Sequence, residues 1–84
     1  MKDNKINVEL LVPSIKEKYN ISIPVSKTIG EVIIILNKTI NELNNSFPVV
    51  NNLSLLNVIE NKIYDINIDI LSSGIKNGAI LALI

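Results

Sequence analysis

Few side chains in this 84-residue chain could perform chemistry. The candidate nucleophiles are Ser14, Ser72 and Ser73, but the chain has no histidine to serve as their general base and no Gly-x-Ser-x-Gly elbow. Cysteine is also absent, which removes thiol chemistry and disulfides and, together with the lack of histidine, disfavours zinc and copper sites. We therefore expect no catalytic residue and no enzyme activity.

The remaining chemical candidates are carboxylates and a glycine-rich stretch near the C-terminus. Glu60, Asp65 and Asp69 lack the ligand-at-every-second-residue spacing of a calcium loop, so we interpret them as solvated groups or, for Asp69, as a helix cap. The stretch from Gly74 to Gly78 could be taken for a phosphate loop, but it precedes a strand pattern instead of a helix. The sequence thus predicts neither a metal nor a cofactor.

Composition narrows the class of protein further. Eight basic and eight acidic residues balance, and no basic cluster suggests contact with nucleic acid. The longest apolar runs, 32–36 and 79–84, are too short to cross a bilayer, and the polar N-terminus lacks the apolar segment of a signal peptide. We expect one domain over residues 1–84, located in the cytoplasm and not inserted in a membrane.

The first third of the chain predicts a hairpin followed by a helix. Apolar residues alternate with polar ones over 6–12 and again over 19–25, and Pro24 places the second strand at a sheet edge. Thr28 and Glu31 form a capping-box pattern that begins a helix over 29–43. Its apolar stripe comprises Ile29, Val32, Ile33, Leu36, Ile40 and Leu43, and the polar positions away from that stripe are Asn37, Lys38, Asn41 and Glu42.

The rest of the chain predicts three strands and one helical turn. A strand over 53–59 should turn Leu56 and Val58 inward, and a short strand follows at 63–64. Asp69 and Gly74 bound a single helical turn at 70–73, Asn77-Gly78 redirects the chain, and 79–84 forms the last strand. That order predicts an α+β β-grasp fold: a mixed sheet of four to five strands, its first and last strands parallel, with one main helix on one face.

The chain resembles the YukD/EsaB family of ubiquitin-like proteins, which accompany bacterial type VII secretion systems. The residues that carry the resemblance are Asn61-Lys62-Ile63-Tyr64, Leu71, Gly74-Ile75-Lys76-Asn77-Gly78, Leu81 and Leu83. The resemblance implies a ubiquitin-like fold and a cytosolic accessory or regulatory component that contacts proteins of the secretion machine. It implies no catalytic residue. A related domain forms the cytosolic part of a membrane subunit in mycobacterial systems, so a domain of a larger membrane protein stays open.

Apolar residues that should avoid the core form the candidate interaction site. If Leu81 and Leu83 face the helix, their neighbours in the last strand face the other way, because side chains alternate along a strand. The resulting candidate surface is Ile80, Ala82 and Ile84, joined by Leu11 and Leu55. Ile34 should be exposed on the helix, in contact with either a loop or a partner. The partner would be a secretion subunit or a second copy of the chain.

A different functional class is a ubiquitin-like sulfur carrier or modifier. Such a protein is activated at a flexible C-terminal Gly-Gly tail, whereas this sequence stops at Ile84 within a strand pattern. We therefore favour a non-conjugating interaction module. A native gene that continued to Gly-Gly would restore the carrier hypothesis.

Overall fold

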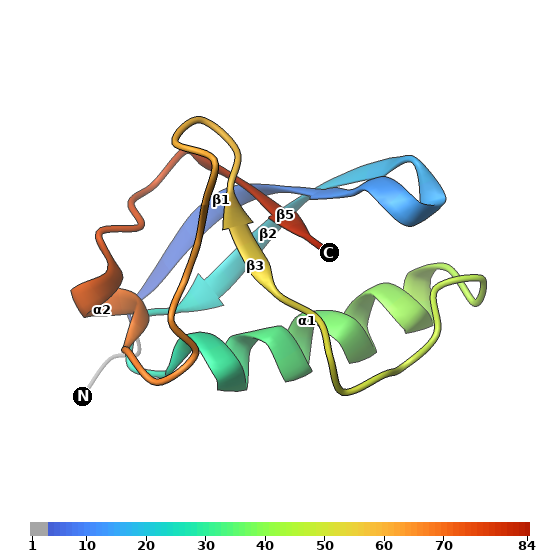
Figure 1. Ribbon diagram of the computed structural model, residues 1–84, viewed down its shortest axis with the longest axis horizontal. Coiled ribbons are helices and arrows are strands. Elements are labelled where there is room, and N and C mark those ends of the chain that lie inside the picture. The colour runs from blue at the N-terminus through green and yellow to red at the C-terminus, as the bar shows by residue number, and fades with distance from the viewer. Residues whose placement is uncertain (1–3) are drawn as a thin grey trace.

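A long N-terminal hairpin and one main helix dominate the structure (Figure 1). The computed structural model describes residues 4–84. The hairpin consists of β1 (Lys5–Val12) and β2 (Glu17–Pro24), joined by a 3₁₀ turn at Pro13–Ile15. The remaining elements are α1 (Ile29–Leu43), β3 (Leu55–Asn57), β4 (Lys62–Ile63), α2 (Ile70–Ser73) and β5 (Ala79–Leu83).

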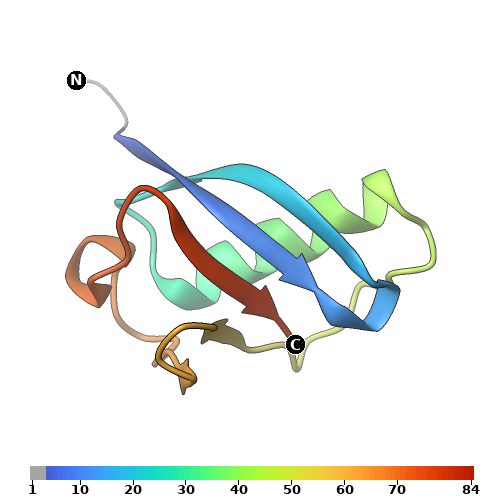
Figure 2. The same cartoon turned by 90° about the horizontal axis from the view of Figure 1, so that it is seen from above.

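The strands form a sheet in the order β2-β1-β5-β3-β4. β1 and β5 pair in parallel, and the other neighbours pair antiparallel, so the sheet is mixed. α1 crosses one face of this sheet (Figure 2). The predicted β-grasp arrangement is confirmed, including the parallel pairing of the first and last strands and the position of Pro24 in an edge strand.

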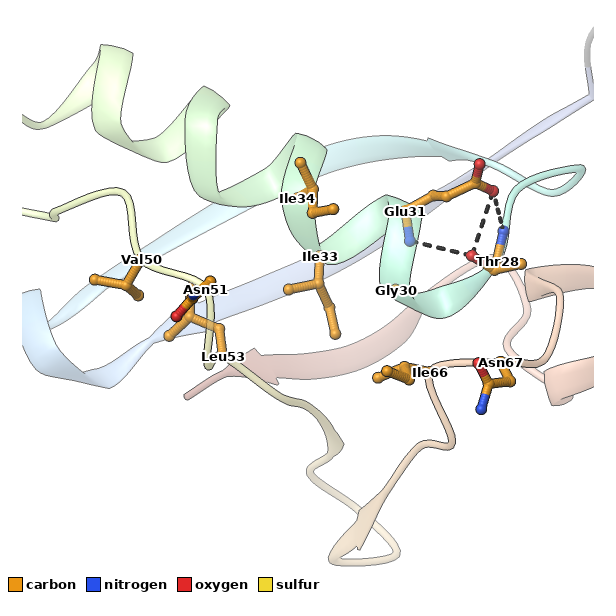
Figure 3. Close-up of a pocket in the computed structure, with 10 residues that line it drawn as sticks. All are labelled: Thr28, Gly30, Glu31, Ile33, Ile34, Val50, Asn51, Leu53, Ile66 and Asn67. Atoms are coloured by element: carbon orange, nitrogen blue, oxygen red, sulfur yellow. Dashed lines mark hydrogen bonds between the residues drawn. The ribbon is translucent and has the colours of Figure 1, made fainter.

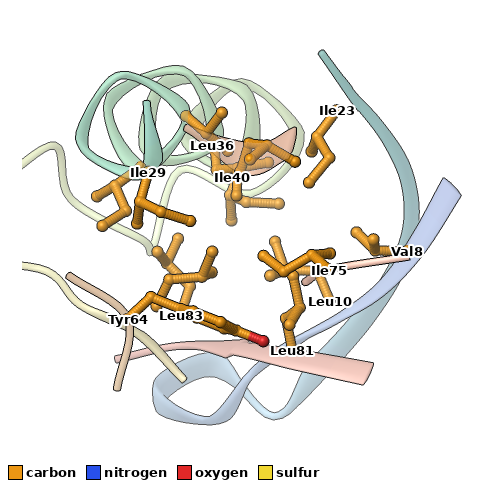
Figure 4. Packing of buried hydrophobic residues seen from close by; sticks show 14 of the residues in the cluster. Val8, Leu10, Ile23, Ile29, Leu36, Ile40, Tyr64, Ile75, Leu81 and Leu83 are labelled. Carbon is orange, nitrogen blue, oxygen red and sulfur yellow. The ribbon is translucent and has the colours of Figure 1, made fainter. Parts of the chain in front are cut away.

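The core lies between α1 and one face of the sheet. This is the face to which the alternating apolar residues of the strands point. Val8, Leu10 and Val12 of β1 are buried there, as are Leu81 and Leu83 of β5. Leu36 and Ile40 of α1 point toward these strand residues (Figure 4). The alternation of apolar and polar residues in the hairpin therefore corresponds to one buried face of the sheet.

The bounds of α1 agree with the prediction, and its capping box is formed: the Thr28 hydroxyl accepts from the Glu31 N–H, and a Glu31 carboxylate oxygen accepts from the Thr28 N–H. Two details of the apolar stripe are wrong. Leu43 is 62% exposed in the last turn, and Phe47 enters the core instead. Asn37 is 2% exposed, because the segment that follows α1 folds back over it.

The prediction for β3 is also wrong in length and phase. The strand spans three residues, and Leu55, not Leu56, is buried. Pairing with β5 fixes this phase: Leu55 lies opposite Leu83, and Leu56 lies opposite Ala82. Since Leu83 faces α1, its neighbour Leu55 must do so as well.

From β4 to α2, the observed strand bounds and helix cap differ slightly from the prediction. β4 covers 62–63 instead of 63–64, which leaves Tyr64 to be buried after the strand. Asp69 occupies the N-cap of α2, but its side chain makes no capping hydrogen bond. Gly74 ends the turn at φ +86°, a conformation that glycine adopts readily, as predicted.

Candidate protein-interaction surface

The face of the sheet turned away from α1 is not covered by any element that residues 4–84 form (Figure 2). Backbone pairing places four apolar residues side by side across it. Leu11 lies opposite Ala82, Ala82 opposite Leu56, and Leu56 opposite Ile63. We call these four residues the open-face row. The row runs across four strands without interruption.

The members of the row differ in how far they reach into solvent. Leu11 and Leu56 are half-buried, and Ile63 is 57% exposed. The prediction that Ala82 is an exposed contact residue is wrong, because it is only 3% exposed. Its small side chain lies between Leu11 and Leu56 and forms the floor of the row.

Ile80 of β5 and Ile84, the residue after β5, extend the apolar area on either side of Ala82. Ile80 is half-buried and Ile84 is 46% exposed. Two backbone hydrogen bonds between Ile84 and Ser54, of 2.7 and 3.0 Å, hold Ile84 beside the sheet. The structure thus brings together Leu11, Ile80, Ala82 and Ile84, which the sequence had grouped.

Leu55 does not belong to this surface. It is fully buried against the helix side, so its assignment to the open face is wrong. Leu56 takes that place, and Ile63 joins it from β4. Sequence reasoning missed Leu56 because Leu55 and Leu56 are adjacent and equally apolar, so alternation alone could not fix the phase of β3. It missed Ile63 because the place of Ile63 beside Leu56 depends on the pairing of β4 with β3.

The other half of the open face is polar. Lys18 of β2 and Glu9 of β1 form an ion pair of 3.3 Å, and the Ser22 hydroxyl donates to the Asn7 side chain. Such an exposed pair contributes only about 0–1 kcal/mol to stability. The polar groups matter for recognition, because protein interfaces commonly have an apolar centre bordered by polar residues.

Ile34 lies elsewhere, on α1, where its side chain is 58% exposed. It lines a groove of about 550 Å³ on the helix side of the molecule (Figure 3). Ile33 and Ile34 form one wall, Val50 and Leu53 form the second, and Ile66 closes one end. The prediction of exposure is confirmed, and the expected loop lies opposite Ile34 across an open groove.

Gly30 allows the segment around Ile66 to lie directly against the start of α1. The Gly30 N–H donates to the Ile66 carbonyl over 2.9 Å. A Cβ at position 30 would stand 3.2 Å from that carbonyl oxygen, tighter than most contacts that such atoms make. The glycine thus shapes the end of the groove.

The Thr28–Glu31 capping box borders the same groove (Figure 3). Hydrogen bonding to the Thr28 N–H lowers the pKa of the Glu31 carboxyl below its ordinary value of 4.5; the Thr28 hydroxyl and nearby Lys27 lower it further. Glu31 is therefore ionised at neutral pH.

This lowered pKa predicts a pH dependence of stability. A carboxylate whose pKa is depressed on folding stabilises the native state above its unfolded-state pKa, and that contribution is lost as the pH falls through the folded-state pKa. We expect Glu31→Gln to have a lower urea midpoint than wild type at pH 7. The difference should disappear as the pH falls from about 4.5 downward. Parallel urea titrations of both proteins from pH 7 to pH 2.5 measure it, and a constant difference would contradict the assignment.

Ser73 and Asp65, two of the residues considered first for chemistry, take part in local hydrogen bonds that stabilise turns. The Ser73 hydroxyl donates to the Ile70 carbonyl and accepts from the Ile75 N–H, which ties the end of α2 to the following corner. An Asp65 carboxylate oxygen accepts from the Asn67 N–H in a local turn.

Among residues 4–84, no three His, Cys, Asp or Glu side chains gather in a group that could hold a metal ion. In the same range, no helix has the length and apolar character needed to cross a membrane.

The architecture defines the class: the chain has the ubiquitin-like β-grasp fold. Its sequence matches no protein-family model and no curated protein. Solved structures do match. The ubiquitin-like domain of EccD5 from Mycobacterium xenopi superposes with a TM-score of 0.78 and 15% identity, over 96% of this chain and 93% of that one. The ubiquitin-like domain of the Mycobacterium tuberculosis type VII secretion system protein ECCD1 gives 0.74 and 11%, over 96% and 98%.

The same fold also occurs in a different setting. A chain of the toluene 4-monooxygenase HD complex superposes with a TM-score of 0.71 at 7% identity, over 95% of this chain and 96% of that one. Identities this low establish a common fold. The role of the present chain has to be argued from its own surfaces.

Proposed function

We propose that this chain is a non-conjugating, non-enzymatic protein-interaction module of a bacterial type VII secretion system, and that it binds its partner through the open-face row. The observation that carries the proposal is the continuous apolar row across four strands, on a face that no described element covers. Contiguous apolar surface bordered by polar groups marks interaction sites on soluble proteins.

The secretion setting is part of the proposal and is drawn from two likenesses. The ubiquitin-like domains of two EccD proteins have the same fold over nearly the whole chain. The corner from Gly74 to Gly78 and the last strand resemble those of the YukD/EsaB family. We accordingly propose a cytosolic accessory or regulatory role, with a subunit of the secretion machine as the partner.

Charge placed on the open face should abolish binding and leave the fold intact. We expect the double variant Ile63→Lys with Ile80→Lys to lower the free energy of unfolding by no more than about 2 kcal/mol. Ile63 is 57% exposed, and a lysine at the half-buried position 80 can extend its ammonium group into water. A charge buried against an apolar partner is costly to desolvate, so binding should fall at least tenfold. The measurement is co-purification and titration with the type VII secretion subunits encoded in the same genome.

Leu71→Lys is the matched control, since Leu71 is 75% exposed on α2 and lies outside the row. It adds one lysine, half of the charge change of the double variant, and should bind like wild type. Sedimentation of the wild-type chain alone tests the second-copy partner. If the double variant folds and binds the subunits as tightly as wild type, the open face is not the interface.

A further inference from the structure

The groove between α1 and the segments 50–53 and 66–67 is a second site, separate from the open face. It contains none of the open-face residues. Its first wall belongs to α1, which lies on the other face of the sheet (Figure 2). Its volume of about 550 Å³ falls within the range of about 300–1,000 Å³ usual for ligand pockets. Ile34, Val50 and Ile66 surround it and are 58%, 43% and 54% exposed, so exposed apolar side chains converge on a concave surface.

The charge at the groove selects against an anionic occupant. The first N–H groups of α1 are already used: Ile29 donates to the Ile68 carbonyl, Gly30 to the Ile66 carbonyl, and Glu31 to the Thr28 hydroxyl. No backbone donor of the first turn is left for an anion. Glu31 is the one ionisable side chain that lines the groove, so the lining itself carries a negative charge; Lys27 lies outside the lining, near enough to lower the pKa of Glu31.

The Glu31 carboxylate retains capacity for a cation. Both hydrogen bonds that it accepts from Thr28 end on one oxygen, Oε1, at 2.9 and 3.3 Å. Within residues 4–84, Oε2 accepts no hydrogen bond and has no Lys or Arg nitrogen within 4.0 Å. A cationic group held at the mouth of the groove would therefore meet an unshared carboxylate oxygen beside apolar walls.

The shape favours a peptide over a small molecule. Small-molecule sites enclose about 70–90% of their ligand, whereas the walls of this groove remain largely open to solvent. Asn51 and Asn67 stand at opposite ends of the groove (Figure 3). Neither side-chain amide makes a hydrogen bond within the described part of the chain, so both can pair with the backbone of an extended segment.

We propose that this groove binds an extended segment of a partner protein in which a branched apolar residue is adjacent to lysine or arginine. The apolar side chain lies between Ile33, Ile34 and Ile66, and the basic group pairs with Glu31. This site adds a second contact to the interaction module and does not depend on the open-face row.

The test starts from a phage-displayed library of random linear seven-residue peptides, selected on the wild-type protein. We expect enrichment of an apolar residue next to Lys or Arg. A synthetic copy of the most enriched peptide is then titrated into ¹⁵N-labelled protein, and the amide signals of Gly30, Ile34, Asn51 and Asn67 should shift. No enrichment, or enrichment of acidic peptides, would overturn the proposal.

Two variants separate the parts of the site. Glu31→Gln keeps an oxygen for the capping box but removes the charge, so peptide affinity should fall about two- to fivefold, and less at 0.5 M salt. Ile34→Ser removes apolar surface at an exposed position and should reduce affinity at least fivefold. If Ile34→Ser binds the peptide with the same affinity as wild type, the groove is not the peptide site.

Ile80→Lys distinguishes this site from the open face and should bind the peptide like wild type. Shifts confined to Leu56, Ile63 and Ile80 would overturn the groove proposal and support the open face instead. Loss of subunit binding in the open-face variant, with peptide binding retained, would support both sites independently.

Discussion

Leu36→Ala is expected to lower the free energy of unfolding by about 2–5 kcal/mol, the cost of emptying a buried leucine site in a packed core. Leu36 is 1% exposed at the centre of the buried stripe of α1 and points toward the sheet (Figure 4). Small domains have a total stability of only about 5–15 kcal/mol, so a substantial fraction would be lost. Urea denaturation followed by circular dichroism measures the effect.

Ile35→Ala is the control, because it removes a branched side chain from the next position on α1. Ile35 is 40% exposed, so the loss should stay below about 1 kcal/mol. Equal midpoints for wild type and Leu36→Ala would mean that the orientation of α1 on the sheet differs from the one described here.

Asn37→Ala is expected to cost about 1–3 kcal/mol, for a reason that does not involve apolar packing. The buried Asn37 amide donates to the Pro48 carbonyl over 2.9 Å, and its oxygen accepts from the Val50 N–H over 2.9 Å. These two bonds attach the connection between α1 and β3 to the helix. Without them, the connection should open locally before the domain unfolds.

Amide hydrogen exchange at Val50 is the sharpest readout of that change. Exchange there should accelerate in Asn37→Ala more than at Leu10 or Leu81, which lie in the central strands. Asn45→Ala, at an exposed position after the helix, should leave both the midpoint and the Val50 exchange rate unchanged. Uniform acceleration at every site would indicate a general loss of stability instead of a local attachment.

Local patterns in the sequence determined most of the fold. The period of two over β1 and β2, the capping box at Thr28 and Glu31, and the 3.6-residue stripe of α1 each depend on neighbours within one element. Such signals can be read without knowing the partner elements. The corner from Gly74 to Gly78 likewise follows from local turn preference, and the positive φ angles of both glycines agree with it.

Tertiary structure decided what no single element could. The phase of β3 followed from its register with β5, which buried Leu55 and left Leu56 on the open face. The burial of Asn37 depended on a loop that folds back from outside the helix, and the groove at Ile34 required segments 50–53 and 66–67 to meet α1. The alternation of side chains along the last strand was enough to predict that Ile80 lies on the open face. The row from Leu11 to Ile63 became definite only when long-range strand pairing fixed which side chains are neighbours.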